Sequence, residues 1–193
     1  FTNHLLKLSK VGNIRVKIHR EILGKIKTCS LVQNASGSWH VVFSCEVDVS
    51  PLPEIDKAVG IDVGLENFAT LTDGKIIPNP RFYKKSEKVL AKEQRKLSKL
   101  TKGTPERRKQ GKRLAKVHEK ISNRRKDFCH KLSKKIVHEY QYICIEDLNI
   151  KKMVQDNYLA KGIHDASWNQ FRQFLSYKAV EAGRKIGIAN PAY

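Results

Sequence analysis

One segment restricts the fold of this chain more than any other, because residues 84–135 combine very high charge with apolar residues at helical spacing. The segment holds 21 of the 38 lysines and arginines, and only five acids: Glu87, Glu93, Glu106, Glu119 and Asp127. Apolar side chains recur at steps of three, four or seven residues, as on one face of a helix: Leu114, Val117, Ile121, Phe128, Leu132 and Ile136. The pattern predicts long amphipathic helices with basic outer faces.

A turn divides this segment into two predicted helices. The first, which we expect to begin after Ser86, is marked by three leucines: Leu90, Leu97 and Leu100. Thr104 can cap the second helix, and Pro105 suits the first helical position because it needs no N–H donor there. We therefore predict an antiparallel helical hairpin over about residues 83–139.

The charge of the hairpin indicates a polyanionic partner. Residues 84–135 contribute +16 of the formal net charge of +19. A solvated, charged coiled coil is the alternative, but such helices usually mix Glu with Lys. An excess of one sign repels itself unless a polyanion such as nucleic acid lies against it. The predicted nucleic-acid contacts are Arg107, Arg108, Lys109, Lys112, Arg113, Lys116, Arg124, Arg125 and Lys126.

The N-terminal part reads as a small antiparallel β module. Three alternating stretches over residues 13–19, 25–33 and 38–49 are separated by turn-forming residues. We expect Trp39 to pack within the strands rather than to stack on a base. The Pro-containing stretch at residues 50–54 predicts a boundary between an N-terminal domain, 1–53, and a second domain, 54–193.

The second domain is predicted to be an α/β domain with a mixed sheet. The expected order is three strands forming a meander, the helical hairpin, a fourth strand, a polar loop, a helix and a fifth strand. Their predicted ranges are 58–64, 67–73, 75–79, 141–148, 149–166, 167–185 and 186–190, with the hairpin between the third and fourth strands. A right-handed crossover through the hairpin would bring the fourth strand back parallel to the first.

Two acids in these strands are candidates for metal-dependent chemistry. Strand alternation places Asp62 on one face with Gly60 and Gly64, which would leave open space around the carboxylate. Glu146 would lie near it if the two strands are neighbours. Two facing carboxylates repel unless a cation such as Mg²⁺ or Mn²⁺ lies between them. Capping or salt-bridging roles remain the alternative, and Asp147, facing the other way, is a weaker candidate.

The remaining composition excludes other classes. The four cysteines form no CxxC pair and the seven histidines no HxxxH or HExxH spacing, so we expect reduced, mostly buried thiols and no zinc site. No apolar run approaches the ~18 residues of a membrane span. We therefore expect a cytoplasmic protein without a membrane partner.

The ordered motifs resemble a known family. The segments AVGIDVGLENFATLTDGKIIPNPRF, YICIEDLNIKKM and DASWNQFRQFLSYKAVEAGRKIG, with the basic hairpin between the first two, look like the OrfB/TnpB proteins of bacterial insertion sequences. Residues 19–47 are similar to the β module of that family. The resemblance implies a RuvC-like, RNase H-like nuclease core carrying the hairpin as an insertion, with Asp62 as first catalytic aspartate and Glu146 as catalytic glutamate.

The resemblance also implies an activity and partners. Members are transposase-associated proteins, related to the ancestors of type V CRISPR effectors, and act as RNA-guided DNA endonucleases. We accordingly expect two-metal phosphodiester hydrolysis with Mg²⁺ or Mn²⁺ in support of transposition. The expected partners are DNA and a guide RNA, in the nucleoid of a prokaryotic cytoplasm.

Two departures from the family pattern bear on activity. After the segment corresponding to residues 190–193 the family continues with a zinc ribbon and a third catalytic aspartate, and its nucleic-acid-binding region extends further at the N-terminal side. We therefore expect a fragment that binds nucleic acid but is inactive alone. A non-catalytic nucleic-acid-binding remnant stays open as an alternative. An actin-like or sugar-kinase-type ATPase, whose first phosphate loop also reads Asp-x-Gly, is less favoured.

Overall fold

The computed structural model describes residues 5–148, 150–153, 155 and 157–189. By its internal contacts the chain divides into two compact units, residues 1–48 and residues 49–193. The domain boundary predicted after residue 53 lies five residues beyond the boundary between these units, which follows residue 48. Each unit is described by itself.

The first unit consists of two antiparallel pairs of strands. Strand β1 (Leu5–Leu8) pairs with β2 (Gly12–Arg15), and β3 (Lys25–Gln33) pairs with β4 (Trp39–Glu46). The expected antiparallel module is present, but the first predicted strand ends at Arg15 and pairs with β1, which was not predicted because its apolar alternation is too short. The prediction for Trp39 is wrong: this side chain, at the end of the β3–β4 hairpin, is 64% exposed.

The second unit contains the predicted mixed sheet. Its strands are β5 (Ala58–Val63), β6 (Asn67–Leu71), β7 (Ile76–Pro78), β8 (Tyr142–Glu146) and β9 (Lys185–Ala189). They lie in the order β7-β6-β5-β8-β9. The meander β5-β6-β7 is antiparallel, while β8 runs parallel to both β5 and β9. This is the RNase H-like strand order, so the predicted fold class is confirmed. Asn190, the last residue of the predicted fifth strand, lies outside the described residues.

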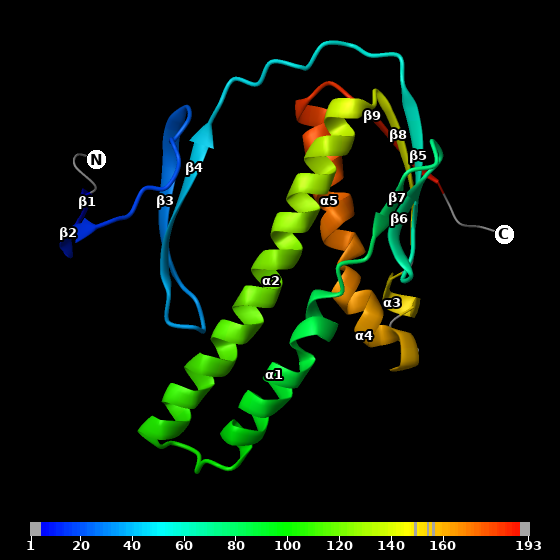
Figure 1. The fold of residues 1–193 in the computed structure, drawn as a ribbon. Helices are drawn as coiled ribbons and strands as arrows, with labels where there is room; N and C mark the ends of the chain where they lie inside the picture. Colours follow the sequence, from blue (N-terminus) through cyan, green and yellow to red (C-terminus); the bar gives the residue numbers. More distant parts are fainter. Residues whose placement is uncertain (1–4, 149, 154, 156, 190–193) are drawn as a thin grey trace. The chain divides into compact units, whose positions relative to one another are not determined.

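Helices α2 (Pro105–Glu139) and α5 (Trp168–Glu181) pack against one face of this sheet (Figure 1). The inward residues of the strands and the inner faces of these helices form one core, which includes Phe68, Ile136, Ile143, Phe171 and Leu175. All five side chains are at most 2% exposed. The apolar stripe predicted for the second helix contributes three buried residues, Ile121, Leu132 and Ile136. The sheet therefore has one helix-covered face.

The helical hairpin is present as predicted. Helix α1 (Phe82–Ser98) runs antiparallel to α2 and lies beside it (Figure 1). The hydroxyl of Thr104 caps α2, accepting a hydrogen bond from the backbone N–H of Arg107 at 3.3 Å. Helix α1 begins at Phe82, before the predicted start after Ser86, because its cap is provided by a residue far along the chain.

The loop predicted over residues 149–166 is wrong in its larger part. Helix α3 (Ile150–Met153) and helix α4 (Asn157–Ala166) lie in this region, and residues 149, 154 and 156 are outside the described residues. Two residues of α4, Ile163 and Ala166, are buried in the core of the second unit. This burial stabilises a helix whose polar sequence had indicated a loop. Throughout the part of the chain that the structure describes, no helix is both long and apolar enough to cross a membrane.

Candidate metal and nucleic-acid site

The candidate carboxylates lie on adjacent parallel strands. The register pairs Gly60 with Cys144 and Ile61 with Ile145, so the following residues on the two strands are Asp62 and Glu146. The isoleucines are buried against the helices, at 4% and 3% exposure. Because side chains alternate along a strand, Asp62 and Glu146 point to the opposite, outer face. The sheet therefore brings the two predicted residues to one place.

The glycines that flank Asp62 lie against neighbouring residues and do not leave the open space around the carboxylate that we expected. A Cβ atom at Gly60 would lie 2.8 Å from Cγ2 of Thr72, and one at Gly64 would lie 3.2 Å from the backbone oxygen of Asn67. Thr72 also bonds Gly60 twice: its Oγ1 accepts from the N–H and its own N–H donates to the carbonyl, both at 3.0 Å. These glycines permit close packing within the meander. Close packing therefore explains these glycines without a ligand beside Asp62, although Gly60 also borders the open groove on the outer face of the sheet.

The carboxylates themselves are suited to a hard cation. Asp62 is exposed and Glu146 is half-buried, so both can reach a solvated ion. Carboxylate oxygens are the ligands that Mg²⁺ and Mn²⁺ prefer. Among the described residues, no group of three or more His, Cys, Asp or Glu side chains is arranged to hold a metal. The pair therefore supplies two ligands of any such site.

Glu146 also lines a small cavity of about 30 Å³ at the end of β8. The cavity is bordered by the N-terminal turns of α5, with Trp168, Asn169 and Arg172 among its lining residues. Asp147 forms an ion pair with Arg172. Asp147, the weaker of the candidate metal ligands, therefore has a structural role as the partner of Arg172. No local sequence pattern singles out Arg172, because its position beside Glu146 depends on how α5 packs.

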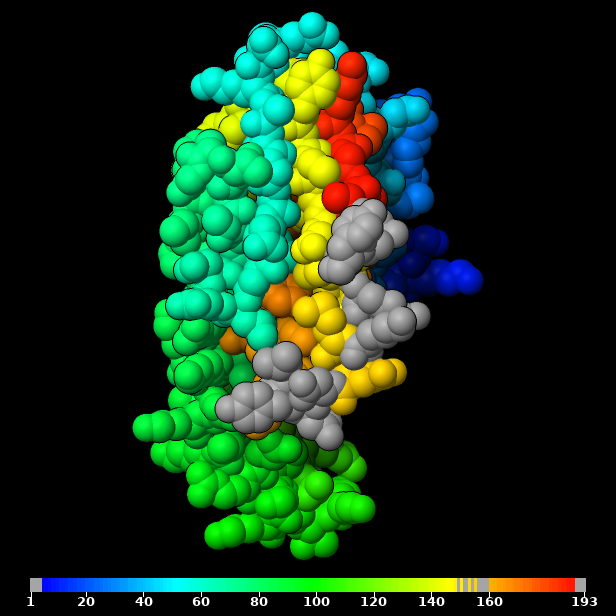
Figure 2. Space-filling model, turned by 90° about the vertical axis from the view of Figure 1, so that its right-hand side faces the viewer, coloured from blue at the N-terminus to red at the C-terminus, as the bar shows by residue number. Residues whose placement is uncertain are grey.

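The outer face of the sheet carries an open groove of about 520 Å³. Figure 2 looks onto this face, where β5, β8 and β9 lie side by side. The groove is lined along its length by small residues such as Gly60, Cys144 and Gly187, with Tyr142 and Lys185 also on its border. Cys144 is exposed here, and Cys29 is exposed in β3; only Cys129 is buried. The prediction of mostly buried thiols is therefore wrong, because Cys144 lies on the outer face of the sheet and every residue of β3 is exposed.

The predicted nucleic-acid contacts fall into two groups. Seven of them are exposed on α2: Arg108, Lys109, Lys112, Arg113, Lys116, Arg124 and Lys126. Arg107 instead donates from Nη1 to the backbone oxygens of Leu97 and Leu100, at 2.7 and 2.6 Å, and closes the hairpin turn. Arg125 donates from Nε and Nη2 to Oδ1 of Asp165, at 3.1 and 2.9 Å. These two guanidinium groups hold the fold together, so the exposed seven form the basic face of α2.

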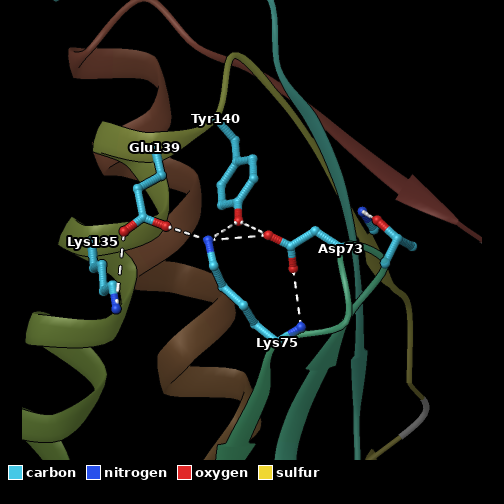
Figure 3. Close-up of polar contacts among 7 residues, drawn as sticks. Asp73, Lys75, Lys135, Glu139 and Tyr140 are labelled. Atoms are coloured by element: carbon cyan, nitrogen blue, oxygen red, sulfur yellow. Dashed lines mark hydrogen bonds and ion pairs between the residues drawn. The ribbon is translucent and has the colours of Figure 1, made fainter.

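A second polar cluster links the sheet to α2 and was not predicted. Figure 3 shows Lys75, in the β6–β7 connection, between Asp73, Glu139 and Tyr140. Its Nζ lies 3.1 Å from Oδ2 of Asp73 and 3.0 Å from Oε2 of Glu139, and donates to the hydroxyl of Tyr140 at 2.7 Å. The hydrogen bond from Tyr140 is the main cause that lowers the pKa of Asp73 to about 2. Since every group has a partner, the cluster is a structural link.

Fold and site together define a class of protein: an RNase H-like α/β domain with a carboxylate pair on its outer sheet face and a basic helical hairpin. The sequence places the chain more narrowly. It belongs to the OrfB_IS605 family, described as probable transposase, whose sequence model matches residues 41–157. The resemblance to OrfB/TnpB proteins is thereby confirmed.

Two curated relatives illustrate the family. A protein of Streptomyces pristinaespiralis, provisionally named an RNA-guided DNA endonuclease, is 38% identical over 161 residues, covering 83% of this chain and 40% of the relative. The protein InsQ of Escherichia coli K12, with the same provisional name, is 29% identical over 207 residues, covering 99% of this chain and 51% of the relative. The chain thus spans about half the length, or less, of these relatives.

A solved structure is also similar to this chain. A Cas12f1 chain, from a cryo-electron-microscopy complex with a single guide RNA and target DNA, gives a TM-score of 0.48 at 17% sequence identity. The match covers 81% of this chain and 40% of the Cas12f1 chain.

Proposed function

We propose that this chain forms the metal-binding and nucleic-acid-binding part of a transposon-encoded, RNA-guided DNA endonuclease. Asp62 and Glu146 bind Mg²⁺ or Mn²⁺, and the basic face of α2 binds the phosphate backbone of DNA or guide RNA. The names of the relatives support the choice of substrate and guide. Family membership favours this function over an actin-like or sugar-kinase-type ATPase.

The observation that carries the proposal is the parallel register of β5 and β8. It places Asp62 and Glu146 on one outer face, next to each other on neighbouring strands. Two like charges so placed favour a cation between them, because the cation removes their repulsion. Acidic residues that only cap or form salt bridges at strand ends would not need to lie at matching positions of neighbouring strands and on the same face of the sheet.

A bound divalent pair would clamp the attacking and leaving oxygens of an in-line phosphodiester displacement. The residues of this chain would fix the position of the ions and of the nucleic acid. Two carboxylates provide fewer oxygens than a six-coordinate ion takes. Phosphate oxygens, water and ligands outside the described residues would complete the coordination.

The proposal is tested first by metal binding. We expect Asp62→Asn and Glu146→Gln each to weaken Mn²⁺ binding about tenfold or more, because each removes one of two charged ligands. Electron paramagnetic resonance of free Mn²⁺ measures the affinity directly. Asp127→Asn is the matched control, since it neutralises an exposed carboxylate that pairs with Lys131 on α2. Unchanged Mn²⁺ affinity in both site variants would contradict the metal site.

Cleavage provides the second test, on whichever form of the protein, this chain or a longer one that contains it, cleaves DNA. Asp62→Asn should abolish Mg²⁺-dependent DNA cleavage while leaving DNA binding intact. The carboxylate would hold the metal ion that the reaction needs, whereas the basic hairpin would provide the affinity for DNA. A variant that keeps its cleavage rate would favour the alternative, a nucleic-acid-binding protein whose acids only support the fold. That alternative is consistent with the finding that, among the described residues, no three or more His, Cys, Asp or Glu side chains are grouped so as to hold a metal ion.

A further inference from the structure

The N-terminal end of α5 lies beside Glu146 and presents several hydrogen-bond donors there. Trp168, Asn169 and Arg172 all line the cavity that Glu146 borders. Their spacing along α5 puts the first and last on one side of the helix, one turn apart. These side chains belong to neither the carboxylate pair nor the basic face of α2. They form a separate set of donors at the edge of the proposed metal site.

Two observations show that these donors are not fully used within the chain. Trp168 is only 5% exposed. Its indole Nε1–H is buried and has no hydrogen-bond partner among the described residues. Helix α5 starts without a side-chain cap, because Ser167 makes no capping hydrogen bond. Buried donors are normally paired, so an orphaned one indicates a missing acceptor. An uncapped helix N-terminus attracts negative charge.

Arg172 adds a positive charge at this point. Its guanidinium pairs through Nη1 with Asp147, and the side chain remains 35% exposed. A guanidinium has five N–H donors in a planar fork, so the contact with Asp147 leaves donors for another oxygen. Arginine in this setting is well matched to phosphate oxygens.

We propose that Arg172, with Asn169 and the N-terminal turn of α5, binds a phosphate of a single nucleic-acid strand next to Glu146. The inference rests on the proposed function and specifies how that site receives its substrate. The cavity of about 30 Å³ is the size of one water-sized group. A phosphate oxygen can therefore enter it, whereas a nucleotide base cannot.

This assignment solves an electrostatic difficulty of the site. A phosphodiester approaching Asp62 and Glu146 meets two negative charges, and Asp147 adds a third nearby. Arg172 offsets part of this repulsion and holds the strand beside Glu146, with which it lines the same cavity. Asp147 competes with the phosphate for the guanidinium and so reduces its affinity for the strand.

The experiment measures the binding of a short single strand, tetrathymidylate, in EDTA so that no metal takes part. The chain has two tryptophans, Trp39 and Trp168, so in a Trp39→Phe background the emission reports on Trp168 alone. We expect the oligonucleotide to change this emission. Arg172→Ala should weaken binding about tenfold, as loss of a charged hydrogen bond does, and should abolish the emission change.

Two further variants make the result specific. Lys161→Ala removes another exposed cation that pairs with a carboxylate, Glu87, and should change the affinity less than twofold. Asp147→Asn should leave binding unchanged or tighter, since it frees the guanidinium. The inference is overturned if Arg172→Ala equals Lys161→Ala, or if Asp147→Asn weakens binding as much as Arg172→Ala, which would mark the ion pair as purely structural.

Folding and the metal site are checked separately. Circular dichroism verifies each variant, and Arg172→Gln, which keeps most of the side chain, carries the same expectation if Arg172→Ala does not fold. Arg172→Ala should not weaken Mn²⁺ binding. A failure of the metal site would show as unchanged Mn²⁺ affinity in Asp62→Asn. A failure of the present inference would show as unchanged binding of tetrathymidylate by Arg172→Ala in EDTA.

Discussion

At Asp73, the hydroxyl group of one tyrosine is the main cause of a lowered carboxylate pKa. Tyr140 donates a hydrogen bond to Oδ2 of Asp73, and Lys75 lies 3.1 Å from the same oxygen. The same hydroxyl is also the main cause that raises the pKa of Lys75 above its usual range. Burial is the main cause that raises the pKa of Tyr140 itself. All three shifts move the titration of these groups further from physiological pH, at which Asp73 and Lys75 are charged and Tyr140 is neutral.

The lowered pKa of Asp73 predicts an acid-dependent part of the stability. The folded-state pKa of about 2 lies below the ordinary value of 3.8. The stabilisation is therefore fully present above pH ~4 and is lost as the pH falls through about 2. Asp73→Asn should remove this part of the pH dependence, as measured by urea unfolding midpoints between pH 2 and 5.

The control for this prediction is Asp127→Asn. Asp127 carries an exposed ion pair with Lys131 at 2.7 Å, and such pairs contribute little. This variant should retain the wild-type pH profile. If Asp73→Asn also retains it, the Tyr140–Asp73 hydrogen bond does not stabilise the folded state.

At the scale of elements, Asp165 joins three helices. It comes from α4, its carboxylate accepts hydrogen bonds from the N–H groups of Tyr83 and Lys84 at the start of α1, and it pairs with Arg125 of α2. The Tyr83 bonds measure 2.8 and 3.0 Å. The Asp165 side chain is 7% exposed. The cap of α1 is thus provided from about eighty residues further along the chain.

Removing this carboxylate should weaken the attachment of the hairpin. Asp165→Ala should lower the free energy of unfolding by about 3 kcal/mol, because it breaks a mostly buried ion pair and removes a helix cap. Arg125→Ala should cost less, since Asp165 keeps its bonds to α1. Urea unfolding measures both, and amide hydrogen exchange should show faster exchange in the first turn of α1.

An exposed pair provides the comparison for this experiment. Lys161→Ala should change stability by less than about 1 kcal/mol, because its pairing with Glu87 is largely solvated. Equal losses in Asp165→Ala and Lys161→Ala would show that α4 does not anchor the hairpin.

At the scale of the whole molecule, the positive charge is concentrated on the exposed side of helix α2. The seven predicted contacts on the basic face of α2 are exposed, while the carboxylates Asp62 and Glu146 lie on the outer face of the sheet. The net charge of +19 is therefore not spread evenly over the surface. The proposed phosphate contacts on α2 and the proposed metal ligands therefore lie on different parts of the second unit.

This separation predicts a change in the salt dependence of binding. Replacing Arg108, Lys109 and Lys112 together by Gln should reduce the slope of log affinity against log salt by roughly 2 to 3, because each phosphate contact contributes about 0.9 for duplex DNA. Fluorescence anisotropy with a labelled duplex over a range of salt concentrations measures the slope. The Mn²⁺ affinity should not decrease.

Arg107 is the matched control on the same helix. Its guanidinium bonds the carbonyl groups of Leu97 and Leu100, so Arg107→Gln should lower stability and change the salt slope little. If the triple variant leaves the slope unchanged, the basic face of α2 does not bind the phosphate backbone.

Much of the fold was predictable because the decisive signals are local. The Thr104-Pro105 pair marks the start of α2, since it satisfies backbone donors within a few residues. The strict alternation in β5 and β8 correctly assigned inward and outward side chains, because a strand has a period of two. Helix α4 was missed because its stability comes from burying Ile163 and Ala166 in a core formed by distant residues.

The sequence by itself determined which residues form the strands of the sheet, where the long helix begins and which segment carries the charge, since propensity, periodicity and capping act over a few residues. Only the tertiary structure decided that Asp165 caps α1, that Arg107 and Arg125 face inward, and that Arg172 borders the same cavity as Glu146. These contacts join elements far apart in the chain. They depend on how the core packs, and no local pattern contains that information.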